Sequence, residues 1–492
     1  GKYNFTTNLP DTINYNDVDY YKRNVFNHSL RMEYHAAKFK ISSTTGYQYL
    51  KDYLLLDQDF TARSVFTLLQ NQKLNSINEE VTIRSTTNNN LLWIGGINAF
   101  YQNVGTVSKV TFKEDGIAMI QQNMNNSGIP FLITLTDESI PIYGDYVTRN
   151  YGLAGFVQST YNNLFIKGLS LSAGWRIDYE HASLKHFTNG MFNYSIKMGP
   201  TVINREKNDT IAGKESMSFT QLLPKFSLRY EKNKNVVYAA ISKGYKAGGY
   251  NLQMFSDLME TQMRSMSPPE FDIQSSTSFK PEYSWNYEIG GRISVWESKI
   301  NAGLTFFLLD IKDQQLTEFA PNGQGRMIKN AGESESKGIE FDANTYPVNG
   351  LRLGINYGFT HNKFTNYKEQ IDDLTTIDYS GKYVPFVPMH TFAVSADYSI
   401  NLNKSFIDRF TISGQYSGAG KIYWTEANDV SQKFYSLLSG KISAEKGVLT
   451  LSIWARNLLD TKYTTFYFKT FGNSFGQLGK PVHWGIDLNI KF

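Results

Sequence analysis

WGIDLNIKF, residues 484–492, ends the chain and alternates apolar residues with small or polar ones. Successive side chains of a β-strand point to opposite faces, so this strand has one apolar face and one polar face up to its last residue. A soluble protein rarely leaves such an apolar face open, whereas a barrel in a membrane places it against lipid. The alternation therefore predicts a membrane-spanning strand whose apolar residues are Trp484, Ile486, Leu488, Ile490 and Phe492.

The composition of the 492 residues favours strands as the membrane-spanning elements. Aromatic residues make up 15% of the chain, and Tyr and Trp prefer the boundary between lipid and water. No apolar run approaches the roughly 18 to 20 residues that a membrane-spanning helix needs. Since only helices and closed barrels satisfy their backbone hydrogen bonds in lipid, we expect an antiparallel β-barrel.

Charge and cysteine content exclude several other functions. The net charge of +4 is too small to indicate a nucleic-acid partner, and the lack of cysteine excludes disulfides and thiolate metal sites. The sequence contains no catalytic Ser/His/Asp or acidic constellation. The Gly248-Gly249 pair follows a predicted strand and precedes no helix, so it is not expected to bind phosphate. We therefore expect neither an enzyme nor a cofactor.

Alternating segments recur along the chain and predict seventeen strands between residues 28 and 492. Short and long connections alternate between them without exception. Outer-membrane barrels have short periplasmic turns and long external loops, so we expect all long loops on one side. The predicted long loops are 54–78, 105–147, 181–216, 248–278, 363–387 and 458–480.

The direction of the last strand places residues 1–27 in an external loop segment and residues 28–492 in the barrel. Bacterial single-chain barrels have even numbers of strands, so an odd count predicts that this chain lacks the beginning of its barrel. Two unpaired edges would then face lipid, where each unmade backbone hydrogen bond costs several kcal/mol.

Several segments, taken in order, resemble TonB-dependent outer-membrane receptors. ARNLLDTKY at 455–463, followed by GKPVHWGIDLNIKF at 479–492, resembles the end of these receptors. The resemblance covers residues 28–492 and is nearest to the ferric-siderophore branch, including receptors of the pesticin/yersiniabactin type. Other resembling segments are LLPKFSLRY at 222–230, GYKAGGYN at 244–251, KPEYSWNYEIGGR at 280–292 and NAGESESKGIEFD at 330–342.

The resemblance implies an all-β, antiparallel transmembrane barrel in a Gram-negative outer membrane. This chain would supply about the last seventeen of 22 strands, without the plug domain. The resemblance implies a receptor that imports a scarce ligand, a ferric siderophore above all, energised through TonB in the complete protein. The implied partners are outer-membrane lipid, the ligand, TonB through the missing plug segment, and a surface lipoprotein. The closing residues would also form the signal for barrel assembly.

External aromatic and cationic side chains are the candidate ligand-binding residues. Ferric siderophores are often anionic and carry aromatic rings, which Tyr, Trp, Arg and Lys can bind by stacking and charge. An ordinary aromatic girdle with solvated loop charges is the alternative interpretation. The candidates are Tyr245, Tyr250, Arg326, Lys329, Tyr423 and Trp424.

Three other clusters fit an ordinary structural role better than a binding site. His181 and His186 share one predicted external loop and could bind a metal or haem. The methionines of LQMFSDLMETQMRSM at 252–266 suit a soft metal, but their spacing predicts a short amphipathic helix. The aspartates within 372–378 could bind a hard cation or form a solvated acidic loop.

A second functional hypothesis is a passive outer-membrane channel or a surface interaction barrel without energised transport. The missing plug sequence motivates this alternative. Diffusion of small sugars through the purified chain would favour a channel.

Overall fold

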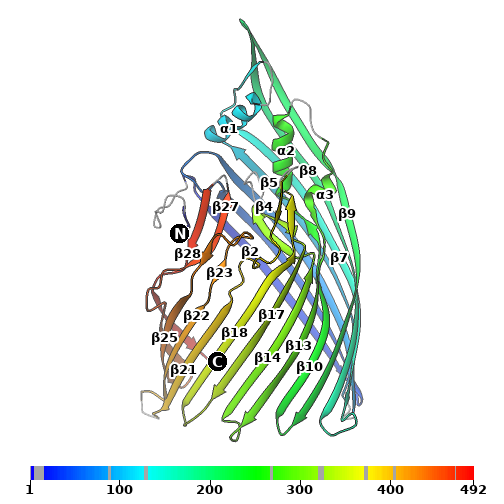
Figure 1. Ribbon diagram of the computed structural model, residues 1–492, viewed down its shortest axis with the longest axis vertical. Coiled ribbons are helices and arrows are strands. Elements are labelled where there is room, and N and C mark those ends of the chain that lie inside the picture. The colour runs from blue at the N-terminus through cyan, green and yellow to red at the C-terminus, as the bar shows by residue number, and fades with distance from the viewer. Residues whose placement is uncertain are drawn as a thin grey trace.

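The structure of the protein is a computed structural model in which strands form a tall, barrel-shaped wall (Figure 1). Short turns lie at its lower end, and helices and long hairpins lie at its upper end. No helix in the described part is long and apolar enough to cross a membrane. The described residues are 2–4, 16–86, 90–126, 131–265, 270–319, 326–370, 375–402, 406–470 and 473–491.

One antiparallel sheet forms the wall, and its strands pair in the order in which they follow along the chain, which confirms the all-β prediction. The short β6 (Leu132–Leu135) pairs in addition with β8. The strands are β2 (Tyr20–His35), β3 (Phe39–Asp57), β4 (Phe66–Ser85), β5 (Leu91–Phe112), β7 (Ile140–Asn162), β8 (Leu169–Met198), β9 (Thr201–Lys232), β10 (Asn235–Lys246), β13 (Glu282–Val295), β14 (Ile300–Lys312), β17 (Glu333–Thr345), β18 (Leu351–Asn366), β21 (His390–Asn401), β22 (Arg409–Ala419), β25 (Tyr435–Lys446), β26 (Leu449–Arg456) and β29 (His483–Ile490).

The strand registers run from β2 through to β29, and within the described residues no register joins these two strands. All sixteen residues of β2 are exposed, as expected of a strand at the edge of the sheet. The number of strands in the complete barrel and the absence of a plug stay predictions.

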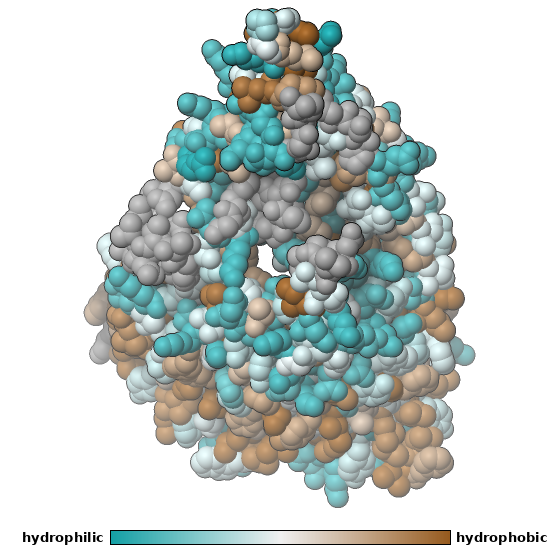
Figure 2. All heavy atoms as spheres, turned by 45° about the horizontal axis from the view of Figure 1, so that its top comes forward, coloured by the Kyte–Doolittle hydropathy of each residue, from teal (hydrophilic) through white to brown (hydrophobic). Residues whose placement is uncertain are grey.

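The outer face of the wall is apolar. Ile453 lies opposite Ile486, and Leu451 lies opposite Leu488, so residues of one kind share one face across two strands. Trp484 is 72% exposed, which suits lipid far better than water. Figure 2 shows such brown, apolar residues gathered over the lower part of the molecule. The alternation predicted for the last strand is therefore confirmed as far as Ile490, while Phe492 lies outside the described residues.

Several strands extend much farther than predicted. The predicted loop 181–216 consists largely of the outer halves of β8 and β9, and the predicted loop 54–78 is mostly strand as well. The first strand begins at Tyr20, so the predicted external segment 1–27 is partly strand. The sequence pattern changes along these strands although backbone pairing continues, so alternation located only part of each strand.

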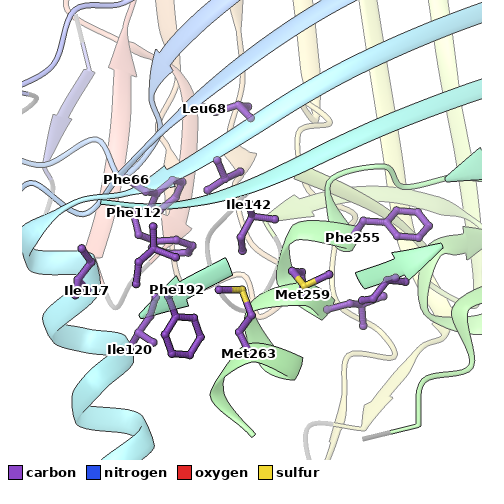
Figure 3. Close-up of a cluster of buried hydrophobic side chains, with 14 of the residues drawn as sticks. Phe66, Leu68, Phe112, Ile117, Ile120, Ile142, Phe192, Phe255, Met259 and Met263 are labelled. Atoms are coloured by element: carbon purple, nitrogen blue, oxygen red, sulfur yellow. The ribbon is translucent and has the colours of Figure 1, made fainter. Parts of the chain in front are cut away.

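The buried core of the protein lies at the outer end, between β4–β8 and the external helices (Figure 3). Helix α2 confirms the helix predicted within 252–266, although Met266 lies outside the described residues. The external elements are β1 (Lys2–Asn4), α1 (Glu114–Asn125), β11 (Gly249–Tyr250), α2 (Met254–Arg264), α3 (Ile273–Thr277), β12 (Ser278–Phe279), β15 (Gln315–Phe319), β16 (Arg326–Asn330), β19 (Lys368–Gln370), β20 (Thr376–Asp378), β23 (Ile422–Tyr423), β24 (Ser431–Gln432), β27 (Thr464–Thr470) and β28 (Asn473–Leu478).

Candidate functional site

A cavity of about 550 Å³ lies among the external hairpins. Its walls come from β15, β16 and β27, from the segment just before β21 and from the segment just after β23. These segments follow different barrel strands, so the barrel brings together loops that are far apart in the sequence. The volume is within the range of small-molecule binding sites.

One wall of the cavity is aromatic. The rings of Phe386 and Phe466 stack with centroids 5.6 Å apart and an angle of 20° between their planes. Trp424 meets Phe386 edge-on at 5.4 Å, and Phe468 follows Phe466 along the same wall at 5.7 Å. Such a wall offers flat apolar surface to a planar ring.

A charged side chain lies against this aromatic wall. The guanidinium of Arg326 lies 4.6 Å from the centroid of the Phe466 ring, which is a cation–π contact. Burial lowers the pKa of Arg326, yet an arginine stays charged in proteins. The cavity therefore places a fixed positive charge beside aromatic surface.

Lys329 lies next to this wall, with its Nζ 2.6 Å from a carboxylate oxygen of Glu318, a residue that lines the cavity. Glu369 forms a second ion pair with the same ammonium. Burial alone would lower the pKa of Lys329, but the charge of Glu318 and hydrogen bonds to both carboxylates raise it. Lys329 is therefore a charged structural cation rather than a proton donor.

Two further ionisable side chains line the cavity. Burial raises the pKa of Glu426, so this carboxyl takes up a proton more readily than a solvated one. Lys469 is held 2.9 Å from Asp429 by an ion pair. The wall thus combines aromatic, cationic and carboxyl groups.

The structure brings four of the six predicted residues together. Arg326 and Trp424 line the cavity, and Lys329 contacts its wall through Glu318. Tyr423 precedes Trp424 along the chain. Its ring stacks on the ring of Tyr383, with centroids 5.3 Å apart, and does not line the cavity.

Tyr245 and Tyr250 lie elsewhere and do not line this cavity. The Tyr245 hydroxyl donates a hydrogen bond to Glu180 of β8. Tyr250 packs against the buried cluster of the outer end. Both positions are at the outer ends of strands, as predicted, but Tyr245 contacts the neighbouring barrel strands β8 and β9, and only Tyr250 packs on the external cluster.

Five further residues that line the cavity were not predicted from the sequence. They are Phe386, Phe466, Phe468, Glu318 and Glu426. The segment TTFYFKT at 464–470 carried one available signal, because aromatic residues crowd a predicted external loop.

The two histidines of the predicted loop are residues of β8, which corrects their placement. They are five positions apart, so they lie on opposite faces of the strand and cannot bind one metal together. His181 stacks on Tyr151 at 5.0 Å, and His186 is buried. Asp372 and Asp373 lie outside the described residues.

The fold defines an outer-membrane β-barrel protein, and a cavity lies among its external loops. Residues 1–458 match the family described as TonB dependent receptor-like, beta-barrel, and the chain belongs to this family.

Two relatives are both named pesticin receptor. The receptor of Yersinia pestis is 25% identical over 260 residues, which is 52% of this chain and 34% of that receptor. The receptor of Yersinia enterocolitica is 26% identical over 258 residues, again 52% of this chain and 34% of the relative. The match thus spans about a third of the length of these relatives.

Two solved structures share the fold. The ferric yersiniabactin uptake receptor of Yersinia pestis superposes with a TM-score of 0.70 at 18% identity, over 96% of this chain and 62% of that one. A siderophore receptor of Acinetobacter baumannii gives a TM-score of 0.64 at 13% identity, over 96% of this chain and 65% of that one. At these identities the similarity shows the fold alone.

Proposed function

We propose that this barrel is the ligand-importing part of an outer-membrane receptor and that its ligand is a ferric siderophore. The observation that carries the proposal is the cavity, where the Arg326 guanidinium lies against the aromatic wall. In the complete protein, import would be energised through TonB.

The chemistry of the walls supports a ligand with two features. A planar aromatic ring of the chelate would stack on the wall formed by Phe386, Phe466 and Trp424. An anionic group of the same chelate would bind Arg326, whose charge is fixed. Ferric complexes of phenolate or catecholate siderophores combine both features, whereas a sugar offers neither.

The named relatives support the same class of ligand. One solved structure with this fold is named for ferric yersiniabactin uptake and another is named a siderophore receptor. Because one fold serves many ligands, these names support the proposal less strongly than the cavity does. We also propose that Trp484, Ile486, Leu488, Ile490 and Phe492 form the signal for barrel assembly, as the resemblance implies.

Binding and uptake of iron chelates test the proposal. Deletion of the gene should abolish uptake of at least one ferric siderophore. The R326A and W424A variants should each bind that chelate about tenfold more weakly, since a cation–π contact or a lost stacking partner contributes about 1–2 kcal/mol.

The matched control is R409A, because Arg409 begins β22 at the opposite end of the barrel and is paired with Glu445 at 3.8 Å. This variant should bind like the unaltered chain. Uptake of every siderophore at the original rate after gene deletion would refute the proposed function.

A passive channel is the second candidate. Figure 2 shows an opening that passes between the external elements of this chain. If the chain acts as a channel, proteoliposomes that contain it will swell in small sugars at a rate proportional to the amount of protein. If it acts as a receptor, chelate binding will be saturable and sensitive to R326A.

A further inference from the structure

Helix α2 packs against β7, β8 and β9 at the outer end of the barrel. Phe255 and Met259 are fully buried. The Phe255 ring lies 5.3 Å from the ring of Tyr146 and 4.6 Å from that of His186. Figure 3 shows Phe255, Met259 and Met263 on this helix within the buried cluster. The helix is therefore held by apolar contacts to the sheet.

Two further features hold α2 close to the sheet. Gly190 of β8 leaves room for the helix, since a Cβ added there would lie 2.2 Å from the Met263 sulfur. Lys207 of β9 donates hydrogen bonds to the carbonyl oxygens of Gln262, at 3.1 Å, and of Ser265. A lysine at these orphan carbonyls stabilises the C-terminal end of a helix.

The segment that leads into α2 is tied to the candidate ligand site. The side-chain amide of Asn251 donates to the Ile328 carbonyl and accepts from the Ile328 N–H, both at 2.8 Å, as a paired strand would. The Gln253 side chain accepts from the Arg326 N–H at 2.6 Å. Both contacts fix the edge of β16, the strand that carries Arg326 and Lys329.

Asp257 is the more deeply buried of the two acidic residues of α2. The residue is 4% exposed, and within the described residues neither of its carboxyl oxygens has a hydrogen-bond partner. A carboxylate buried without a partner is strongly disfavoured, whereas a protonated carboxyl is tolerated. Burial raises the pKa of Asp257 to about 8, with a further rise from Glu260 and an opposing effect from Arg264.

The other ionisable groups around α2 each have a charged or polar neighbour, and burial also raises the pKa of Glu260. Glu260 and Arg264 form an ion pair at 3.5 Å on the helix itself. On β8 and β9, His186 lies 3.5 Å from Glu215, and Lys207 lies 3.4 Å from Asp209. Burial lowers the pKa of His186, so this imidazole favours its neutral form while α2 is docked. From β7 the helix meets the Tyr146 phenol, which bonds Thr188, and the N-cap Asp272 of α3 bonds Ser275 within its own helix. The helix α1 faces it with apolar Ile120 and Met124.

We propose that α2 is a proton-dependent latch: it docks on β7–β9 with Asp257 protonated, and while docked it holds β16 of the candidate ligand site in place. This inference concerns the movement of the outer end and does not depend on which ligand the barrel imports.

The direction of the pH dependence follows from the two states of Asp257. Docking raises the pKa of its carboxyl above the ordinary value, so the stability of the docked state is fully present below the ordinary pKa of an aspartate. That stability is lost as the pH rises, by up to tenfold in the docking equilibrium for each pH unit, until the pH reaches about 8. Through Asp257, acidification therefore closes the latch and alkalinisation loosens it. Below the ordinary pKa of a histidine, about 6.5, protonation of the buried His186 acts in the opposite direction.

Cysteine labelling can measure the docking equilibrium, because the chain has no cysteine of its own. In the M259C variant the thiol is buried while α2 is docked, and it becomes reactive toward maleimide when α2 undocks. The F165C variant, at a residue that is 93% exposed, gives the labelling rate of an open thiol at each pH. The ratio of the two rates removes the intrinsic pH dependence of thiol reactivity.

Between about pH 6.5, above which His186 is neutral in either state, and pH 8 we expect this ratio to rise by several-fold to tenfold per pH unit. With D257N added to M259C, the ratio should become low and its rise with pH much smaller, since only the buried Glu260 of this helix still contributes. With E270Q added instead, which neutralises an exposed acid beyond the helix, the rise should be unchanged. An equal pH dependence with and without D257N would overturn the latch, as would a M259C chain that is never labelled or is labelled equally at every pH.

Discussion

Lys329 shows at the residue scale how the candidate site is built. Its ammonium is held between the carboxylates of Glu318 and Glu369, and its ring neighbour is Tyr367 at 5.7 Å. The sequence predicted Lys329 as a ligand-binding cation, but it could not show that a carboxylate on the paired strand β15 and another on β19 neutralise this charge. Arg326 and Trp424 were predicted from their residue types and do line the cavity. Phe466, whose ring contacts Arg326, was not predicted because it lies more than a hundred residues away along the chain.

The K329M variant should loosen the β15–β16 hairpin. Removal of one partner from a buried ion pair leaves two carboxylates uncompensated, which costs about 3 kcal/mol or more. Hydrogen exchange of the amides of β15 and β16 should become faster by about a hundredfold. The control K421M removes an exposed cation that contacts the Tyr423 ring and hydroxyl, and it should change exchange in this hairpin little.

The ion pairs of Lys329 also predict how the stability of the β15–β16 hairpin depends on pH. The pKa of Lys329 is raised, so its stabilising contribution is fully present below the ordinary lysine pKa and is lost only as the pH rises through a still higher value. Protection of the hairpin amides should therefore be constant between pH 6 and pH 9, after correction for intrinsic exchange. A loss of protection within that range would contradict the assignment of Lys329 as a permanent cation.

At the scale of elements, the sequence predicted the strands inside the membrane and underestimated them outside it. Apolar and polar residues alternate strictly where a strand faces lipid on one side and the barrel interior on the other, so the sequence predicted β26 and β29. The outer part of β8 meets core on one side and water on the other, with Leu184, Thr188 and Phe192 buried among polar neighbours. Such a mixture looks like a loop in sequence, and only the pairing with β9 reveals a strand.

The fit of α2 against β8 gives a prediction for this scale. The G190V variant should force the helix away from the sheet, because added carbons would overlap the Met263 sulfur. Overpacking of this kind costs about 1–3 kcal/mol, so labelling of M259C should become tenfold or more faster at neutral pH. The control G155V fills a position with nothing within 4 Å of an added Cβ, and it should leave labelling unchanged.

At the scale of the whole molecule, external contacts join the two ends of the sheet. Phe60, in the segment after β3, meets the rings of Phe468 and Phe475 at 5.1 Å and 5.9 Å. These residues come from opposite ends of the chain, and the three rings form a buried cluster. The pairing of β1 with β28 lies in the same region. Alternation in sequence could not predict such contacts, because they depend on how the sheet curves.

The F60A variant should free the β27–β28 hairpin from this contact. Loss of a buried phenylalanine costs about 3–5 kcal/mol. In F60A this loss should weaken the contact that holds the β27–β28 hairpin in place. Limited proteolysis should then cut within 464–478 much faster than in the unaltered chain. The F165A variant removes a ring that is 93% exposed and should be cut at the original rate. Equal protection of the hairpin in F60A would show that the cluster does not hold it.

The most direct test of the proposed function is to locate bound iron. Crystals of the chain soaked with ferric phenolate, catecholate or hydroxamate chelates can be measured at the iron absorption edge. We expect an anomalous peak within the cavity bounded by Arg326 and Trp424 for at least one phenolate or catecholate complex. That peak should vanish in crystals of R326A. Iron bound only outside this cavity, or no bound iron with any chelate, would contradict the proposal.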